Sequence, residues 1–231
     1  MKKLLTITAL LALAAVPAQA SVFSVTYQDS VNDLFAGVAG NGTLDIVSVE
    51  VSNDATDLYF KFTVNGDIVA TDWAKYMCII DRAPGGDSSG NGWNRPIGMP
   101  SGADTWIGSW VDGGNGMELY NYSGGWPFPP NYATWLGSPE IGISKTTNTV
   151  TLRANLSTMG LGVGDLFLFD CFSSGGGGGD GAIDSLGNPN QQVGDWGEYS
   201  VAHPLTYRIK PEPTTLSLLG IGALLMIRRR R

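Results

Sequence analysis

Apolar and polar residues alternate with a period of two in several short stretches of the chain. Apolar side chains occupy every second position of residues 46–51 and again of residues 58–64. Because successive side chains of a β-strand point to opposite faces of a sheet, this alternation predicts half-buried strands. The polar residues 53–56 between the two stretches are typical of a turn, so the two strands are expected to form a β-hairpin.

The same period recurs further along the chain, and helical periodicity is nearly absent. Residues 150–156 alternate, whereas residues 166–172 are apolar on both sides and predict a strand buried on both faces. Further short strands are expected at residues 22–28, 76–81, 105–111, 117–122 and 196–201. About eight to ten short strands joined by Gly, Asn and Asp turns predict an all-β fold, a single antiparallel β-sandwich of jelly-roll-like form.

The two ends of the chain carry longer apolar segments. Residues 1–20 begin with Met and two lysines, continue with an apolar stretch and end in Ala18-Gln19-Ala20. This order predicts a signal peptide that directs Sec export and is cleaved after Ala20. Near the other end, the apolar residues 214–227 would extend about 21 Å as a helix. Four arginines follow them, and a basic end of this kind stays in the cytoplasm, so we expect a short transmembrane helix.

Three features follow one another at the C-terminus, namely Pro211-Glu212-Pro213, the apolar segment 214–227 and the arginines 228–231. In this order they resemble the PEP-CTERM sorting signal of Gram-negative bacteria. The resemblance implies that residues 211–231 anchor the chain transiently in the inner membrane until a membrane protease called exosortase processes it. It further implies delivery to the cell surface or the extracellular matrix. Lys210 departs from the family, whose members often have an apolar residue at this position.

Between these terminal segments lies a body that is long enough for one core. We expect the sandwich domain to cover residues 21–201 and a short polar linker, kept extended by its prolines, to cover residues 202–210. The chain carries 21 acidic against 14 basic residues, for a net charge of −7, and its body contains no basic run. Nucleic acid is therefore not an expected partner, because phosphate neutralisation needs clustered Lys and Arg.

Two parts of the body have a further resemblance. Residues 49–62 and residues 155–170 resemble the jelly-roll domains of the family 9 carbohydrate-binding module and the DOMON-like group. The resemblance implies a sandwich that binds sugars or a cofactor at one edge. It is an analogy at the level of the fold, and function has to be argued from a site.

Aromatic residues are concentrated between positions 93 and 135. Sugar rings stack on exposed indoles while neighbouring polar side chains bond the hydroxyls. Trp106 and Trp110 lie on one face of a strand, and we favour the core for both because one face of a sandwich is buried. Trp126 lies among Gly and Pro residues, which favours exposure in a loop. The candidate residues for a glycan platform are Trp93, Arg95, Asp104, Trp110 and Trp126, and for Trp110 the platform is the alternative to the core.

Residues 81–93 form a loop rich in Gly, Asp, Ser and Asn. Calcium takes six to eight oxygen ligands, and glycines let a backbone fold around the ion. Asp81, Asp87 and Asn91 could supply side-chain ligands, although their spacing does not match an EF-hand and an ordinary hairpin loop is the alternative. A weaker candidate for the same ion is the stretch 175–188, with Asp180, Asp184 and Asn188, whose default reading is a flexible surface loop.

The remaining reactive residues are few. Cys78 and Cys171 each lie inside a predicted strand, and they could form a disulfide after export or remain two buried free thiols. His203 is the sole histidine, which leaves no starting point for a Ser-His-Asp triad, a Cys-His pair or a multi-histidine metal centre. A glycosidase needs only two carboxylates, so a hydrolase stays open.

These features together predict an exported, surface-sorted, non-catalytic protein. The expected ligand is extracellular polysaccharide and the expected processing partner is exosortase. Calcium is the one candidate cofactor, and the alternative is that there is none. The alternative from another class is a structural matrix or coat protein that self-associates and binds no defined ligand. A glycan-active hydrolase is a third alternative.

Overall fold

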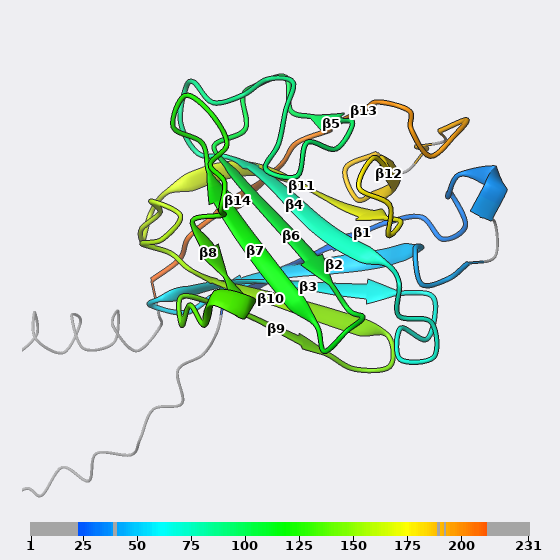
Figure 1. Ribbon diagram of the computed structural model, residues 1–231. Helices are drawn as coiled ribbons and strands as arrows, with labels where there is room; N and C mark the ends of the chain where they lie inside the picture. The colour runs from blue at the N-terminus through cyan, green and yellow to red at the C-terminus, as the bar shows by residue number, and fades with distance from the viewer. Residues whose placement is uncertain (1–22, 39–40, 189, 192, 212–231) are drawn as a thin grey trace, which may run out of the picture. The chain divides into compact units, whose positions relative to one another are not determined.

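Two antiparallel sheets contain most of the strands of the computed structural model, which describes residues 23–38, 41–188, 190–191 and 193–211 (Figure 1). Sheet A has five strands in the order β1 (Phe23–Gln28), β2 (Ile46–Asn53), β3 (Asp57–Val64), β10 (Thr149–Asn155) and β9 (Ile141–Lys145). Sheet B has seven strands. Six of them lie in the order β12 (Ala182–Ser185), β11 (Leu166–Ser174), β4 (Lys75–Asp81), β6 (Thr105–Trp110), β7 (Gly116–Asn121) and β8 (Tyr132–Ala133). The seventh, β14 (Leu205–Arg208), also pairs with β11.

Short elements complete the described part of the chain. They are two 3-10 turns, η1 (Ala36–Val38) and η2 (Thr134–Leu136), and a parallel pair formed by β5 (Ile97–Gly98) and β13 (Ser200–Val201). Across the described ranges no helix is both long and apolar enough to cross a bilayer. The predicted signal peptide 1–20 and residues 212–231 of the predicted sorting signal lie outside the described residues.

The predicted hairpin is present as β2 and β3. The two strands pair in antiparallel register, with Val51 opposite Phe60 and Glu50 opposite Lys61. Asp54 shapes the turn, because its Oδ1 accepts hydrogen bonds from the backbone N–H of Thr56 at 2.8 Å and of Asp57 at 2.7 Å. The alternation of apolar residues predicted the buried face of β3 and of the later part of β2. At the start of β2 a register shift places Ile46 in the core instead of Val47.

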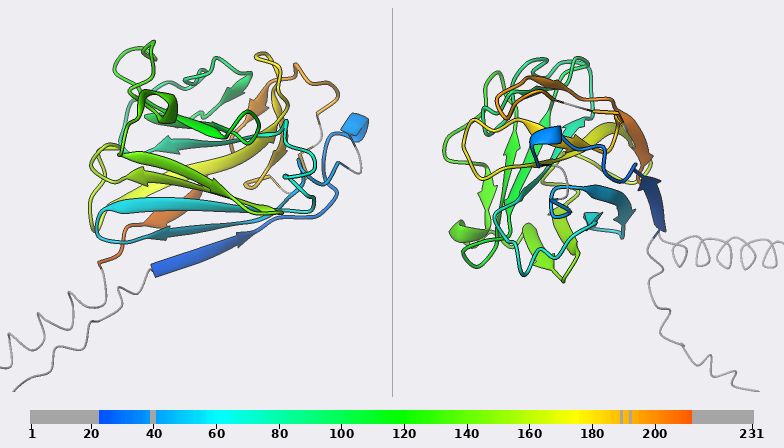
Figure 2. Two further views of the ribbon diagram at one scale, coloured as in Figure 1. Left: turned by 60° about the horizontal axis from the view of Figure 1, so that its bottom comes forward. Right: turned by 90° about the vertical axis from the view of Figure 1, so that its right-hand side faces the viewer.

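Aromatic side chains from both sheets meet in the main core. Phe62 of β3 packs against Tyr76 of β4 with ring centroids 5.5 Å apart, and Phe60 packs against Phe169 of β11 at 5.6 Å. Each pair joins one sheet to the other, so sheets A and B pack face to face (Figure 2). The fold is all-β with antiparallel sheets, consistent with the predicted β-sandwich.

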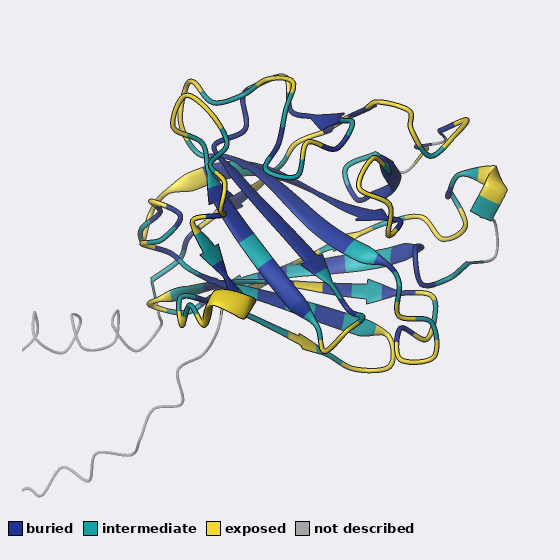
Figure 3. Cartoon of the chain, viewed as in Figure 1, coloured by how far each residue is buried: buried dark blue, intermediate teal, exposed yellow. Residues whose placement is uncertain are grey.

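Sheet B is buried on its outer face as well. A second apolar cluster on that face contains Met77, Trp106 and Phe172 from three neighbouring strands. Ile97 of β5 and Met99 of the loop that follows it cover this cluster. Figure 3 shows the strands of sheet B as buried along much of their length. Trp106 is thus buried as expected, but under loops and not inside the sandwich.

The segment after residue 201 differs from its prediction. Residues 202–210 were expected to be a polar linker, yet Leu205–Arg208 forms β14 and pairs with β11. Tyr207 and Ile209 are buried in the main core, so their apolar side chains draw this segment into the sheet. The strand expected at residues 196–201 is reduced to β13, Ser200–Val201.

The two cysteines are neighbours across strands of sheet B. Cys78 of β4 lies directly opposite Cys171 of β11, with 3.6 Å between their Sγ atoms. Both are buried and are present as free thiols. The structure therefore settles the adjacency that the sequence left open, and it places both sulfurs in the apolar core.

Asn53 joins the end of the β2 strand to the segment that follows β14. Its Nδ2 donates to the carbonyl oxygens of Asp54 and Lys210, and its Oδ1 accepts from the Tyr207 hydroxyl and from the Lys210 backbone N–H. Asn53→Ala would remove all four bonds from a partly buried site, where, of the described partners, the Tyr207 hydroxyl alone keeps another acceptor, the Phe23 carbonyl. We expect a loss of about 2 to 4 kcal/mol in the free energy of unfolding, measured with urea.

Asn155→Ala is the matched control for this prediction. Asn155 lies at an exposed turn. Among the described residues, its side chain bonds only with Ser157, whose backbone N–H and hydroxyl both donate to Asn155 Oδ1. Its removal should cost about 1 kcal/mol or less. Equal losses in the two variants would show that Asn53 does not hold the C-terminal strand in place.

Candidate functional site

The outer face of β6 and β7 carries a row of large side chains. Ile107 of β6 points into the main core, so Trp106, Gly108 and Trp110 point outward. On β7 their partners in register are, in the same order, Tyr120, Glu118 and Gly116. Trp106 and Tyr120 lie beneath the loops, whereas Trp110 and Glu118 are half-buried. The row therefore passes from covered core to accessible surface.

Two glycines allow indole rings to pack directly onto these strands. A Cβ atom on Gly108 would lie 2.3 Å from the ring of Trp93, and one on Gly116 would lie 1.8 Å from the ring of Trp110. Both distances are far below van der Waals contact, so only a residue without a side chain leaves room for the rings. Trp93 and Trp110 are consequently held against adjacent positions of the same sheet face.

Glu118 accepts hydrogen bonds from three surrounding aromatic side chains. Its Oε2 accepts from Trp93 Nε1 at 2.6 Å and from the Tyr120 hydroxyl at 2.8 Å, and its Oε1 accepts from Trp135 Nε1 at 3.2 Å. Burial, followed by the bond to Glu118, raises the pKa of Tyr120, so its hydroxyl remains a donor. Trp135 lies on η2 and is 58% exposed. We call Trp93, Trp110, Glu118 and Trp135 the aromatic face.

Charged groups border the aromatic face. The Arg95 guanidinium lies over the Trp93 ring, with Cζ 5.2 Å from its centroid, and donates to Ser174 Oγ at 2.6 Å. Lys75 is opposite Trp110 in register and forms an ion pair with Asp112 at 3.2 Å. Indole surface beside carboxylates and amines is a combination that suits stacking and hydrogen bonding of a polar ring compound.

The structure brings together only part of the predicted platform. Trp93, Arg95 and Trp110 are neighbours on the outer face of sheet B. Asp104 is buried, and its Oδ2 accepts from the backbone N–H of Arg82 and Ala83. Trp126 was expected to be exposed, but it is half-buried against the second apolar cluster and donates its indole N–H to Asp87. Asp104 and Trp126 therefore hold loops together.

Glu118 and Trp135 were missing from the predicted platform. Glu118 occupies an outward position of β7, which the alternation of residues 117–122 indicates, but the convergence of three donors on it depends on strand pairing. Trp135 reaches Glu118 because β8 pairs with β7, placing Ala133 opposite Glu118. No local pattern in the sequence reveals that pairing.

The loop 81–93 uses its polar residues to fold itself. Asn91 Nδ2 donates to the carbonyls of Arg95 and Ile97, and its Oδ1 accepts from the backbone N–H of Trp93 and Arg95. Asp87 accepts from Ser89, Gly90 and Trp126, and these bonds lower its pKa. The predicted ligands Asp87 and Asn91 thus have structural partners, and burial raises the pKa of the third, Asp81.

A different group of carboxylates has the spacing of a metal site. Oxygens of Asp33, Asp45 and Asp184 all lie within 4.8 Å of one another, and they could hold a metal ion. Asp45 and Asp184 are buried and Asp33 is half-buried. Burial, with the charge of Asp29 as the next cause, raises the pKa of Asp184 to about 9. Of these residues the sequence had indicated only Asp184, in the weaker candidate stretch.

Asp170 is a further buried carboxylate, and it anchors the loops beside β13. Its oxygens accept from the backbone N–H of Gly187 and His203, each at 2.9 Å, and from Ser185 Oγ at 3.0 Å. Burial raises the pKa of Asp170 to about 7 despite these bonds. The carboxylate therefore takes up a proton at a pH where an exposed aspartate would be ionised.

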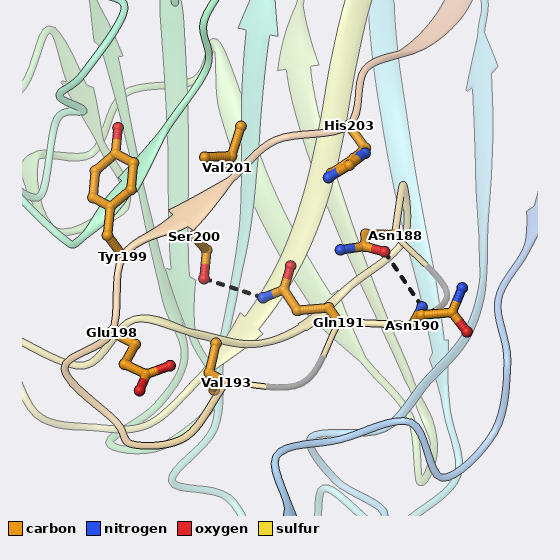
Figure 4. A pocket seen from close by; sticks show the side chains of 9 residues that line it. All are labelled: Asn188, Asn190, Gln191, Val193, Glu198, Tyr199, Ser200, Val201 and His203. Atoms are coloured by element: carbon orange, nitrogen blue, oxygen red, sulfur yellow. Dashed lines mark hydrogen bonds between the residues drawn. The ribbon is translucent and has the colours of Figure 1, made fainter.

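A polar hollow of about 230 Å³ adjoins this anchor. Asn188, Gln191, Glu198, Tyr199 and His203 contribute to its lining (Figure 4). Gln191 is buried, and its Nε2 donates to Ser200 Oγ of β13 at 3.1 Å. The hollow offers amide, carboxylate and imidazole groups, and no pattern in the sequence predicted it.

Comparison with known protein families and with curated proteins finds no match for this chain. The two resemblances drawn from sequence motifs therefore stay predictions. The function has to be inferred from the geometry of the sites described above.

Stability should depend on pH through Asp170. Its pKa is about 7 in the folded chain and about 3.9 in an unfolded one. The folded state therefore binds a proton more tightly, so this contribution to stability is complete at low pH and is lost as pH rises from about 4 through 7. We expect the thermal midpoint, measured in chelator, to fall over this window.

Asp170→Asn separates this contribution from the others. Asparagine keeps one acceptor oxygen but does not ionise, so the midpoint should be lower at acid pH and its decline towards neutral pH shallower. Asp29 and Asp184 also have raised pKa values and act in the same direction, so a residual slope should persist. An unchanged slope in the variant would contradict the assignment to Asp170.

Proposed function

We propose that this chain is an exported, surface-sorted, non-catalytic protein that binds extracellular polysaccharide through the aromatic face. The observation that carries the proposal is the packing of Trp93 and Trp110 onto glycines of one sheet face, next to the exposed Trp135 and around Glu118. Such a surface presents indole rings for stacking on sugar rings and a carboxylate that can accept hydrogen bonds from hydroxyls.

The charge of the chain narrows the class of glycan. Its net charge is −7. Within the aromatic face the carboxylate of Glu118 is bonded, among the described residues, only by neutral donors, whereas the neighbouring Asp112 is paired with Lys75. Like charges repel a polyanion, so neutral sugars fit this surface better than uronic or sulfated ones. We therefore propose a neutral polysaccharide as the ligand.

Export and sorting are part of the same proposal. Cleavage after Ala20 would release the body, and Pro211-Glu212-Pro213 with the segment 214–227 would hold it in the inner membrane until exosortase acts. β14 ends at Arg208 and Pro211 lies three residues later in the sequence, so the motif would closely follow the folded sheet. The final location would be the cell surface or the extracellular matrix of a Gram-negative bacterium.

The cofactor and the detailed form of the sandwich are also part of the proposal. We propose calcium as the cofactor, since an all-oxygen set of carboxylates is the kind of site this ion prefers. We also keep the jelly-roll-like form of the sandwich, with the likeness to family 9 carbohydrate-binding modules and the DOMON-like group, as a proposal. Neither point is needed for the aromatic face to bind a sugar.

A structural matrix or coat protein is the second candidate function. Strand β1 lies at the edge of sheet A, and it alternates exposed with half-buried residues along its length. An exposed edge strand can pair with another copy of the chain. Self-association through β1 would thus favour an assembly role over binding of a defined ligand.

Replacing Trp135 should weaken polysaccharide binding. Trp135 is exposed and makes one described side-chain hydrogen bond, to Glu118, so Trp135→Ala should fold normally. We expect affinity for neutral exopolysaccharides, measured by affinity electrophoresis and tryptophan fluorescence, to fall about tenfold, because a stacking surface is lost. Phe128→Ala is the control, since Phe128 is 93% exposed and lies outside the aromatic face.

The outcomes separate the candidate functions. Equal binding by both variants would exclude the aromatic face as the site. Concentration-dependent assembly without binding to any glycan would favour the matrix protein. Release of reducing ends from a glycan that binds would indicate a hydrolase.

The glycine contact gives an independent test. In Gly116→Ala the new methyl group would collide with the Trp110 ring and displace it, so we expect weaker polysaccharide binding with an unchanged carboxylate. Gly125→Ala is the control, because a Cβ there meets nothing within 4 Å. If Gly116→Ala binds as tightly as the unmodified chain, the position of Trp110 is irrelevant to the ligand.

A further inference from the structure

Three carboxylates meet between the edges of the two sheets, and a fourth lies near them, without a compensating cation among the described residues. They belong to Asp29, Asp33, Asp45 and Asp184. Asp29 and Asp33 lie close enough to Asp184 for their charges to raise its pKa. None of the three ion pairs in the described part of the chain includes any of these residues. Full ionisation of the group would therefore create repulsion that no described lysine or arginine balances.

Several oxygens of this group are buried and unpaired. Both carboxylate oxygens of Asp33 and the Oδ2 of Asp29 are inaccessible and have no hydrogen-bond partner among the described residues. A buried polar atom without a partner carries a desolvation cost that nothing offsets. An oxygen-seeking cation would satisfy these atoms and neutralise the group at the same time.

The four carboxylates come from segments that are far apart in the sequence. Asp29 and Asp33 follow the edge strand β1, and Asp45 directly precedes β2 of sheet A. Asp184 lies on β12 of sheet B and accepts the backbone N–H of Ile46 at 2.6 Å. The segment after β1 also reaches β12 through its backbone, because the Phe35 N–H donates to the Ile183 carbonyl at 3.4 Å.

We propose that a divalent cation bound by Asp33, Asp45 and Asp184, with Asp29 as a further ligand, fastens β1 and the segment after it to sheet B. The proposal rests on the cofactor part of the proposed function and adds the site and its role. All the ligands are carboxylate oxygens, with no His or Cys, which favours calcium over zinc or copper. The ion replaces repulsion between the two sheet edges with a shared attraction.

Metal binding is measured on the full-length chain in detergent, after treatment with EDTA. Titration with calcium chloride and, separately, magnesium chloride should show one calcium ion bound per chain and weaker binding of magnesium. Hydrogen exchange of residues 23–38, followed by mass spectrometry, should slow at least tenfold when calcium is added. Exchange in β3, which lies inside sheet A, should change much less.

Single substitutions locate the site. Asp33→Asn and Asp184→Asn should each weaken calcium binding at least tenfold, while Asp87→Asn should bind as the unmodified chain does. Asp33 makes no described side-chain hydrogen bond, so its variant should keep the fold, which the far-ultraviolet circular dichroism spectrum checks. Unimpaired binding in Asp33→Asn and Asp184→Asn overturns the site, and so does a loss confined to Asp87→Asn.

The remaining outcomes are equally decisive. If the unmodified chain binds neither ion, the proposal fails. If calcium binds but leaves the exchange of residues 23–38 unchanged, the fastening of β1 fails. Trp135→Ala should retain calcium binding, so a failure of polysaccharide binding and a failure of the cation site are seen in separate measurements.

Discussion

Sheet B is covered on both faces, and the rest of the structure depends on this constraint. On the inner face, Tyr76 and Phe169 pack against phenylalanines of sheet A. On the outer face, Trp106 and its apolar neighbours need a cover, which long loops provide. Those loops must be held in place, and the side chains of Asn91, Asp104 and Asp170 do this by hydrogen bonding to backbone groups. Residues that might have bound ligands therefore serve the fold.

The outer cover is incomplete, and the aromatic face lies where it stops. Beyond Trp106 the strands carry Gly108 and Gly116, and indole rings occupy the space that side chains would otherwise fill. The rings are fixed by Glu118 and by contact with the sheet, so little conformational freedom is left to lose when a ligand binds. A rigid, half-exposed aromatic surface is a better binding platform than a flexible loop of the same composition.

Local patterns predicted the strands well and the sites poorly. Alternation over residues 46–64 predicted the β2–β3 hairpin and most of its buried face, because a period of two is a property of the strand itself. It missed the register shift that buries Ile46 instead of Val47. It placed Trp106 and Trp110 on one face, but which face packs on the other sheet depends on the whole topology. The linker prediction for residues 202–210 was wrong because it relied on Pro204 and gave too little weight to the apolar Tyr207 and Ile209, which are buried in the core. Asp33 and Asp184 meet across about 150 positions, a separation that no window of sequence can span.

The acidic group between the sheets poses a question of energy that packing alone does not answer. Ionised carboxylates crowded in this way destabilise a fold, and replacing one by an apolar residue would remove the cost. Protonation of one carboxylate also removes this cost, and the raised pKa of Asp184 shows that this group holds its proton tightly. A cation removes it more completely, because it satisfies the unpaired oxygens of Asp29 and Asp33 as well. The carboxylate group would destabilise the fold without a bound cation and stabilise it with one. The attachment of β1 would therefore depend on the cation concentration around the protein. If the chain is exported as proposed, it would meet calcium at concentrations that suit weak sites of extracellular modules, and the sheet edge would be completed only there.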